Sequence, residues 1–233
     1  MTPVHTRSDS AQSAHGFVLP SPRTGYPQQM RDIDIRLALD SDLRRDHGHD
    51  SDTMIRHEFG LQEGRRRIDV ALLNGHLAGW EIKSDVDTLL RLAGQADVYG
   101  KVLDYITIVT TARYVERATA MLPEWWGVIV AERVDGVVSL EQTRAPRFNV
   151  DVDAMSLAQL LWRDEAIQLL RELGEGKGLS SKARWYAWDR LVNTLTLDEL
   201  RTAVRQQIKG RQEWPGGQLS MPDDARSHTH ASA

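Results

Sequence analysis

The stretch that decides the fold is Arg67-Ile-Asp-Val-Ala-Leu-Leu-Asn-Gly-His-Leu-Ala-Gly-Trp-Glu-Ile-Lys83. Two apolar, β-prone runs lie on either side of Asn74-Gly75, which is a strong short-range signal for a β-hairpin. Two registers are open for this hairpin. A two-residue turn would place Asp69 opposite Trp80, whereas a three-residue connection would place Asp69 opposite Glu81.

The hydrophobic pattern favours the three-residue connection, Asn74-Gly75-His76. In that register one face of the hairpin is wholly apolar and holds Ile68, Val70, Leu72, Ala78, Trp80 and Ile82. The other face holds Arg67, Asp69, Ala71, Gly79, Glu81 and Lys83. A slip of one residue would mix charged and apolar residues on both faces, because it moves every side chain to the opposite side. We therefore expect Asp69, Glu81 and Lys83 to lie together, since opposed residues share a face.

This trio has the chemistry of a metal-dependent hydrolytic site. Two neighbouring carboxylates, Asp69 and Glu81, suit a hard divalent cation such as Mg²⁺ or Mn²⁺, which can polarise a phosphodiester and activate water. Lys83 could orient that water or stabilise developing negative charge. Only five of the 29 basic residues are lysines, so a lysine beside Glu81 is a departure from the usual cation of the chain. The alternative interpretation is a structural salt bridge.

The segments around the hairpin predict a mixed α/β core. A helix is expected over Asp85–Val102, with Gln95 and Tyr99 one turn apart on the same face. The order is helix, three strands, helix, strand, followed by a second hairpin. The other expected elements are helices over Met30–Arg45 and Val115–Leu122 and strands over Met54–Phe59, Tyr105–Thr111, Gly127–Glu132 and Val137–Glu141.

These residues resemble the PD-(D/E)XK nuclease superfamily. Asp69 matches its aspartate, and Glu81-Ile82-Lys83 matches its (D/E)-x-K strand, although Ile68 stands where the superfamily often has proline. Gln95-Ala-Asp-Val-Tyr99 resembles the Gln-x-x-x-Tyr element of the RecB-like branch. The resemblance implies a restriction-endonuclease-like αβββαβ core, with Gln95 and Tyr99 steadying the site or the substrate.

Two narrower families share the central segment. The region from about Arg31 to Trp214 resembles an uncharacterised bacterial family named for an sce-type locus, most plainly in Gly79-Trp-Glu-Ile-Lys-Ser-Asp-Val-Asp-Thr-Leu89. A similar segment occurs in MmcB-like putative DNA-repair endonucleases. These families are known mainly by their sequence pattern, so they imply a fold rather than a substrate.

Further site residues are expected near the hairpin. The superfamily's upstream acidic ligand is assigned to Glu58, at the end of the preceding strand, and Asp34 and Asp40 are alternatives. The non-functional interpretation of Glu58 is a solvated surface charge. The run of Arg65, Arg66 and Arg67 could bind substrate phosphates, since backbone contacts dominate nucleic-acid affinity. A solvated charge run is the alternative there.

After Pro146 the sequence becomes helical in character. Helices are expected over Ser156–Leu173, Lys182–Thr194 and Leu197–Arg211, which form a C-terminal helical appendix. The expected organisation is a disordered tail over residues 1–29, a nuclease-like core over 30–146, the appendix over 147–214 and a second disordered tail over 215–233.

Composition limits the function classes. The net charge of −4 argues against a DNA-binding protein driven by overall basicity, so contact with DNA would need a local patch. No cysteine is present, which excludes disulfides and thiolate zinc sites. No apolar run has the length of a membrane span, and the first residues lack the apolar segment of a secretory signal. A cytoplasmic protein is therefore expected.

The sequence leads to two hypotheses. The first is an Mg²⁺- or Mn²⁺-dependent nuclease acting on DNA, in which Asp69, Glu81 and Glu58 bind the metal and Lys83 assists catalysis. The second is a catalytically silent module with the same fold that binds DNA or a protein partner, for instance in a phage-defence or mobile-element system.

Overall fold

The quoted stretch forms an antiparallel hairpin near the middle of the chain. In the computed structural model, which describes residues 29–179 and 181–212, strand β2 (Arg66–Leu73) pairs with β3 (Leu77–Lys83). Ala71 lies opposite Gly79 and Leu73 opposite Leu77, so the connection has three residues. The backbone N–H of Asn74 donates to the His76 carbonyl and closes the loop. The predicted register is confirmed.

The hairpin belongs to a six-stranded mixed sheet. Its strands lie in chain order, with β3–β4 and β4–β5 parallel and the other neighbours antiparallel. The mixed α/β architecture expected from the sequence is confirmed. The remaining strands are β1 (Met54–Leu61), β4 (Tyr105–Thr111), β5 (Gly127–Val134) and β6 (Val137–Arg144).

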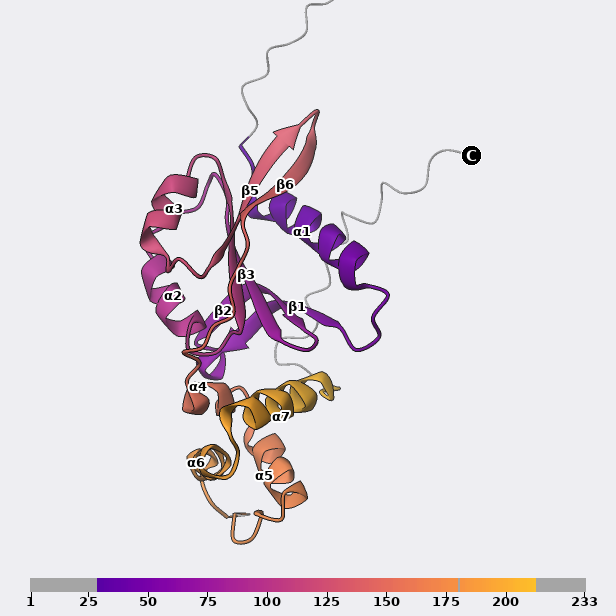
Figure 1. The fold of residues 1–233 in the computed structure, drawn as a ribbon, viewed down its shortest axis with the longest axis vertical. Helices are drawn as coiled ribbons and strands as arrows, with labels where there is room; N and C mark the ends of the chain where they lie inside the picture. Colours follow the sequence, from indigo (N-terminus) through magenta and orange to yellow (C-terminus); the bar gives the residue numbers. More distant parts are fainter. Residues whose placement is uncertain (1–28, 180, 213–233) are drawn as a thin grey trace, which may run out of the picture.

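Helices cover both faces of this sheet (Figure 1). Helix α1 (Asp32–His47) lies on one face and packs Ile35, Leu39 and Leu43 against apolar residues of β2, β3, β4 and β5. Helices α2 (Leu92–Tyr99) and α3 (Val115–Met121) lie on the other face. Each connects two parallel strands, a topology that requires a crossover and commonly uses a helix.

Helix α2 is shorter than the predicted helix over Asp85–Val102. Asp85 and Asp87, at the start of the predicted helix, bind groups outside it instead. Asp85 accepts from the Met30 N–H at 2.8 Å and from the Thr111 hydroxyl at 2.7 Å, and Asp87 accepts from the Ser84 N–H at 2.9 Å. The segment after Lys83 is therefore a loop fastened to β4, and the helix begins only at Leu92.

Strands β1 and β2 change faces in mid-course. Val70 packs on the α1 side, but Ile68 packs in the cluster on the α2 side. The change coincides with Glu58, which has φ 50° and lies across from Asp69 between the His57–Val70 and Phe59–Ile68 pairs. The prediction that Ile68 shares the apolar face of Val70 is therefore wrong. Gly79 makes room for the displaced side chain, because a Cβ there would lie 2.4 Å from Ile68 Cδ1.

Four C-terminal helices lie at one end of the sheet (Figure 1). The helix predicted over Ser156–Leu173 is two helices, because Trp162 has extended backbone and its N–H donates to Glu165 in a new capping box. All four C-terminal helices share one hydrophobic cluster with the α2 face of the sheet. They are α4 (Ala154–Ala158), α5 (Arg163–Glu172), α6 (Arg184–Thr194) and α7 (Leu197–Lys209); a short 3₁₀ turn, η1 (Gln62–Gly64), links β1 to β2.

The predicted disordered tails fall outside the described residues, apart from Gln29. Over residues 29–179 and 181–212, no helix combines the length and apolar character that a membrane crossing needs.

A buried ion pair fastens α7 to the sheet. Asp104, 1% exposed, precedes β4, and its Oδ1 lies 3.0 Å from Arg201 Nε on α7. Its Oδ2 accepts from the Leu77 N–H at 2.8 Å, at the start of β3. One carboxylate therefore joins two strands and a helix. A buried charge left without its partner is strongly destabilising.

We predict that Asp104→Asn lowers the free energy of unfolding by about 3 kcal/mol, because it leaves the buried Arg201 guanidinium with only the exposed Asp198 as a charge partner. Urea denaturation followed by circular dichroism measures the change. Glu175→Gln, which breaks the exposed pair with Arg190, is the control and should cost less than about 1 kcal/mol. Equal effects of the two substitutions would contradict the anchoring role.

Candidate functional site

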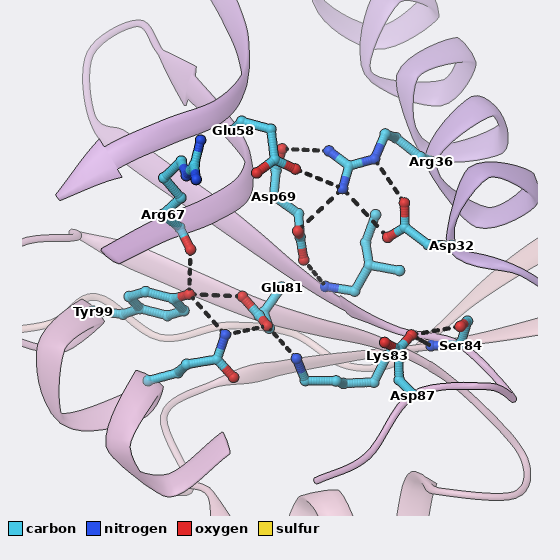
Figure 2. A network of polar contacts seen from close by, with 12 residues as sticks. Asp32, Arg36, Glu58, Arg67, Asp69, Glu81, Lys83, Ser84, Asp87 and Tyr99 are labelled. Atoms are coloured by element: carbon cyan, nitrogen blue, oxygen red, sulfur yellow. Dashed lines mark hydrogen bonds and ion pairs between the residues drawn. The ribbon is translucent and has the colours of Figure 1, made fainter. Parts of the chain in front are cut away.

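The site lies where β2 and β3 separate. Their paired residues end at Val70 and Trp80, while β3 continues along β4 through Lys83. Beyond that point the Asp69 side chain takes the place of a strand partner, and its Oδ2 accepts from the Ile82 N–H at 2.6 Å. Asp69 is thereby held against the strand that carries Glu81 and Lys83 (Figure 2).

Glu81 is a buried carboxylate with three side-chain partners. It is 2% exposed and accepts from Lys83 Nζ, from Gln95 Nε2 at 2.6 Å and from the Tyr99 hydroxyl at 2.8 Å. Gln95 and Tyr99 come from α2, as their helical spacing predicted. Partners of this kind are required because a buried charge is costly unless it is paired and hydrogen-bonded.

Tyr99 links this carboxylate to the edge of β2. Its hydroxyl oxygen lies 2.6 Å from the Arg67 carbonyl and 3.1 Å from Gln95 Nε2. Burial, reinforced by the charge of Glu81, raises the pKa of Tyr99 further above its ordinary value of 10. The phenol therefore stays protonated and serves as a hydrogen-bond donor at neutral pH.

The pKa of Asp69 is raised by its surroundings. Burial first, and then the charge of Glu81, raise the pKa of Asp69 well above its ordinary 3.8, against the opposing effects of the Ile82 N–H and Arg36. Two carboxylates that cannot both ionise at low cost attract a cation, because an added positive charge favours the ionised form of both.

An arginine absent from the sequence prediction contacts Asp69 from α1. Arg36 Nη2 lies 3.1 Å from Asp69 Oδ1 and 3.0 Å from Glu58 Oε1, and Nη1 donates to the Asp69 carbonyl at 2.8 Å. Its Nε contacts Asp32 at 3.0 Å. Only the packing of α1 across the sheet brings this residue to the hairpin, so no local pattern in the sequence marks it.

The three candidates for the upstream acidic residue are now separated. Glu58 lies beside Asp69 through their common contact with Arg36. Asp34 pairs with Arg133 at 3.0 Å, and Asp40 pairs with Arg44 at 2.6 Å and with His57 at 3.0 Å. Asp34 and Asp40 thus take part in other ion pairs.

The arginine run flanks the site without joining its side-chain network. Arg65, Arg66 and Arg67 are all exposed at the start of β2. Arg67 contributes its backbone carbonyl to the site, where it contacts Tyr99.

The side chains around Asp69 and Glu81 offer few ligands to a metal ion. Over the described parts of the chain, no three His, Asp or Glu side chains are grouped closely enough to hold an ion by themselves. The two carboxylates could still supply oxygen ligands to an ion that keeps several waters, as Mg²⁺ does. The buried Gln95 Oε1, beside Glu81, lacks a hydrogen-bond partner and could accept from such a water. A cation bound there would therefore keep several of its waters.

Comparisons with known proteins place the chain in a family. The family described as Bacteriophage P4 protein cII matches residues 28–218. Protein cII of Enterobacteria phage P4 is 26% identical over 182 residues, covering 78% of this chain and 68% of the phage protein. A solved protein of unknown function from Silicibacter pomeroyi is 19% identical, with 58% of this chain and 86% of that chain covered and a TM-score of 0.34. A score this low does not establish a shared fold.

The raised pKa of Asp69 predicts that its charge destabilises the metal-free protein. A carboxyl with a raised folded-state pKa stabilises the fold below its unfolded pKa, and this contribution is lost as the pH rises through the folded-state pKa. Asp69→Asn removes the charge and keeps an acceptor for the Ile82 N–H. We expect the variant to be more stable than the parent by about 1–2 kcal/mol at pH 8 in EDTA, and by less at pH 5.

Urea denaturation at the two pH values measures this difference. Asp97→Asn, an exposed aspartate on α2, serves as the control and should change stability equally little at both. A variant of Asp69 that is less stable than the parent at pH 8 would show that the contact with Arg36 outweighs the cost of the buried charge.

Proposed function

Because the chain belongs to the bacteriophage P4 protein cII family, whose name states no reaction, we propose a function from the site itself: metal-dependent hydrolysis of DNA phosphodiester bonds. The observation that carries the proposal is the junction of Asp69, Glu81 and Lys83 where β2 and β3 separate. A restriction-endonuclease-like core is part of the same proposal. The order of α1, β1–β3, α2 and β4 supports it.

Each residue would contribute in a distinct way. Asp69 and Glu81 would hold the ion, which when bound would polarise a phosphodiester oxygen and lower the pKa of a water molecule. The positive charge of Lys83 would orient the attacking water or stabilise the developing negative charge. Its contact with Glu81 already fixes its ammonium group beside the carboxylate.

Gln95 and Tyr99 would act as positioning residues. Both donate to Glu81 from α2, and their bonds fix the orientation of its carboxylate. Ligands held by an outer set of hydrogen bonds bind metal more tightly than ligands that are free to rotate. This interpretation replaces a direct role in substrate binding for the two residues.

The exposed arginine run would bind the substrate. The run of Arg65, Arg66 and Arg67 directly precedes Ile68 and Asp69 in the chain. Phosphates bound by these arginines would therefore lie near the site. Such contacts carry affinity rather than sequence preference. The relative named above is a bacteriophage protein, so a place in a mobile-element system is also part of the proposal.

Cleavage assays test the reaction. Purified chain is incubated with linear, nicked, branched and single-stranded DNA in Mg²⁺ or Mn²⁺. Lys83→Met and Glu81→Gln should each lower the rate by about 100-fold or more, because they remove a charge used in the transition state. Lys101→Met, at an exposed lysine after α2, is the matched control and should cleave like the parent.

Cleavage that survives both site substitutions would point to a contaminating nuclease and overturn the assignment. If no DNA is cleaved but the parent and both variants bind it equally, the silent DNA-binding module is favoured. If the parent neither binds nor cleaves any of the four DNAs, a module that binds a protein partner is favoured.

The salt dependence of DNA binding tests the arginine run. Arg66→Ala should weaken binding uniformly across DNA sequences and reduce the slope of log affinity against log salt by about one. Arg171→Ala, at an exposed arginine on α5, should leave the slope unchanged. Fluorescence anisotropy with a labelled duplex, in EDTA to prevent cleavage, measures both. An unchanged slope for Arg66→Ala would show that this residue does not touch phosphate.

A further inference from the structure

The guanidinium of Arg36 lies at the meeting point of three carboxylates. Its Nη2 is 3.0 Å from Glu58 Oε1, 3.1 Å from Asp69 Oδ1 and 3.3 Å from Asp32 Oδ2. Figure 2 shows the three acids converging on it from β1, β2 and α1. Arg36 Nη2 therefore occupies a position at which a cation would be within reach of oxygens from three different residues.

This guanidinium is firmly held. Nε contacts Asp32 at 3.0 Å, and Nη1 donates to the Asp69 backbone carbonyl at 2.8 Å, so every nitrogen has a partner. The side chain is only 12% exposed. A planar group bound at all three nitrogens has little freedom to swing aside, unlike the flexible ammonium of a lysine.

The position of Arg36 limits what can bind on the Glu58 side of Asp69. In two-metal nucleases the ions lie about 3.5–4 Å apart and share ligands. Here Asp69, the carboxylate between Glu58 and Glu81, has one oxygen on Arg36 and the other on the Ile82 N–H. A second ion between Glu58 and Asp69 would have to displace a bound guanidinium.

The charge balance of the group agrees with a single ion. The six residues comprise four carboxylates, Asp32, Glu58, Asp69 and Glu81, and two cationic side chains, Arg36 and Lys83. The excess is two negative charges, which one divalent cation neutralises. A second divalent ion would give the same group a net positive charge in a partly buried place, where charges interact strongly.

We propose that Arg36 is the resident second cation of the site, so that the protein binds one divalent ion, at Asp69 and Glu81, instead of two. Glu58 then acts as a partner of Arg36 and not as a metal ligand. This inference rests on the proposed function, since it concerns the metal of that site. Its test measures metal binding, which does not depend on any cleavage.

The experiment counts ions bound to the full chain after treatment with EDTA. Titration with Mn²⁺ is followed by electron paramagnetic resonance, which detects the free ion, and by calorimetry. The parent should bind one Mn²⁺ per chain. Arg36→Gln should bind two, or bind one at least about tenfold more tightly, because a fixed positive charge has been removed from beside the ion.

Arg44→Gln is the matched control. Arg44 lies on the same helix and, like Arg36, pairs with an aspartate four residues earlier, but its partner Asp40 is outside the site. This variant should bind Mn²⁺ like the parent. Asp69→Asn should lose the bound ion.

The outcomes separate the inference from the function on which it rests. Two ions on the parent, or unchanged binding by Arg36→Gln, would overturn the role of Arg36 and leave the metal site intact. No ion on the parent but one on Arg36→Gln would overturn the single-ion site, because Arg36 would then exclude the first ion, and it would count against a metal-dependent reaction. No ion on either protein would overturn both.

Glu58→Gln keeps the proposal testable if Arg36→Gln fails to fold, as a loss of helical circular dichroism would show. Because Glu58 is assigned to Arg36, this variant should still bind one Mn²⁺, with affinity reduced by less than about tenfold through the lost charge. Loss of the ion would make Glu58 a ligand and overturn the assignment.

Discussion

The buried carboxylate of Glu81 is the constraint on which the rest of the site depends. A charge that is 2% exposed must be met by donors, and each donor comes with its own element. Lys83 follows on the same strand, and Gln95 and Tyr99 require α2 to lie against the end of β3. Tyr99 then contacts the Arg67 carbonyl, so the position of β2 follows as well. The arrangement of one helix and two strands is tied to a single charged group.

The separation of β2 from β3 involves a second carboxylate, that of Asp69. A regular ladder would pair backbone groups alongside Glu81, but the Asp69 carboxylate accepts from the Ile82 N–H instead. The strands therefore change faces at Glu58 and Asp69, and Ile68 moves to the cluster on the α2 side. The irregular backbone costs free energy, as strained functional positions commonly do, and the packing on both sides of the sheet maintains it.

Local alternation is sufficient to predict the hairpin register, because a slip of one residue would mix charged and apolar residues on both faces. The same alternation could not reveal the change of face, since Ile68-Asp69-Val70 reads as regular strand. Asp85 and Asp87 satisfy donors outside a helix as readily as those of a helix N-terminus, so the predicted helix begins at Asp85 whereas α2 begins at Leu92. Arg36 depends on the docking of α1 across the sheet, a contact between residues 33 positions apart, and sequence spacing carries no information about it.

The shared core of the sheet and the C-terminal helices limits where the gene can recombine without exposing apolar residues. Asp104 is bonded to both Leu77 and Arg201, and the apolar residues of α4–α7 continue those of the α2 face. A recombination junction near Pro146 would open a hydrophobic surface on both fragments, whose exposure favours aggregation. Only exchange of the whole segment avoids that. The family match over residues 28–218 spans both parts, as expected if the sheet and the C-terminal helices fold around one core.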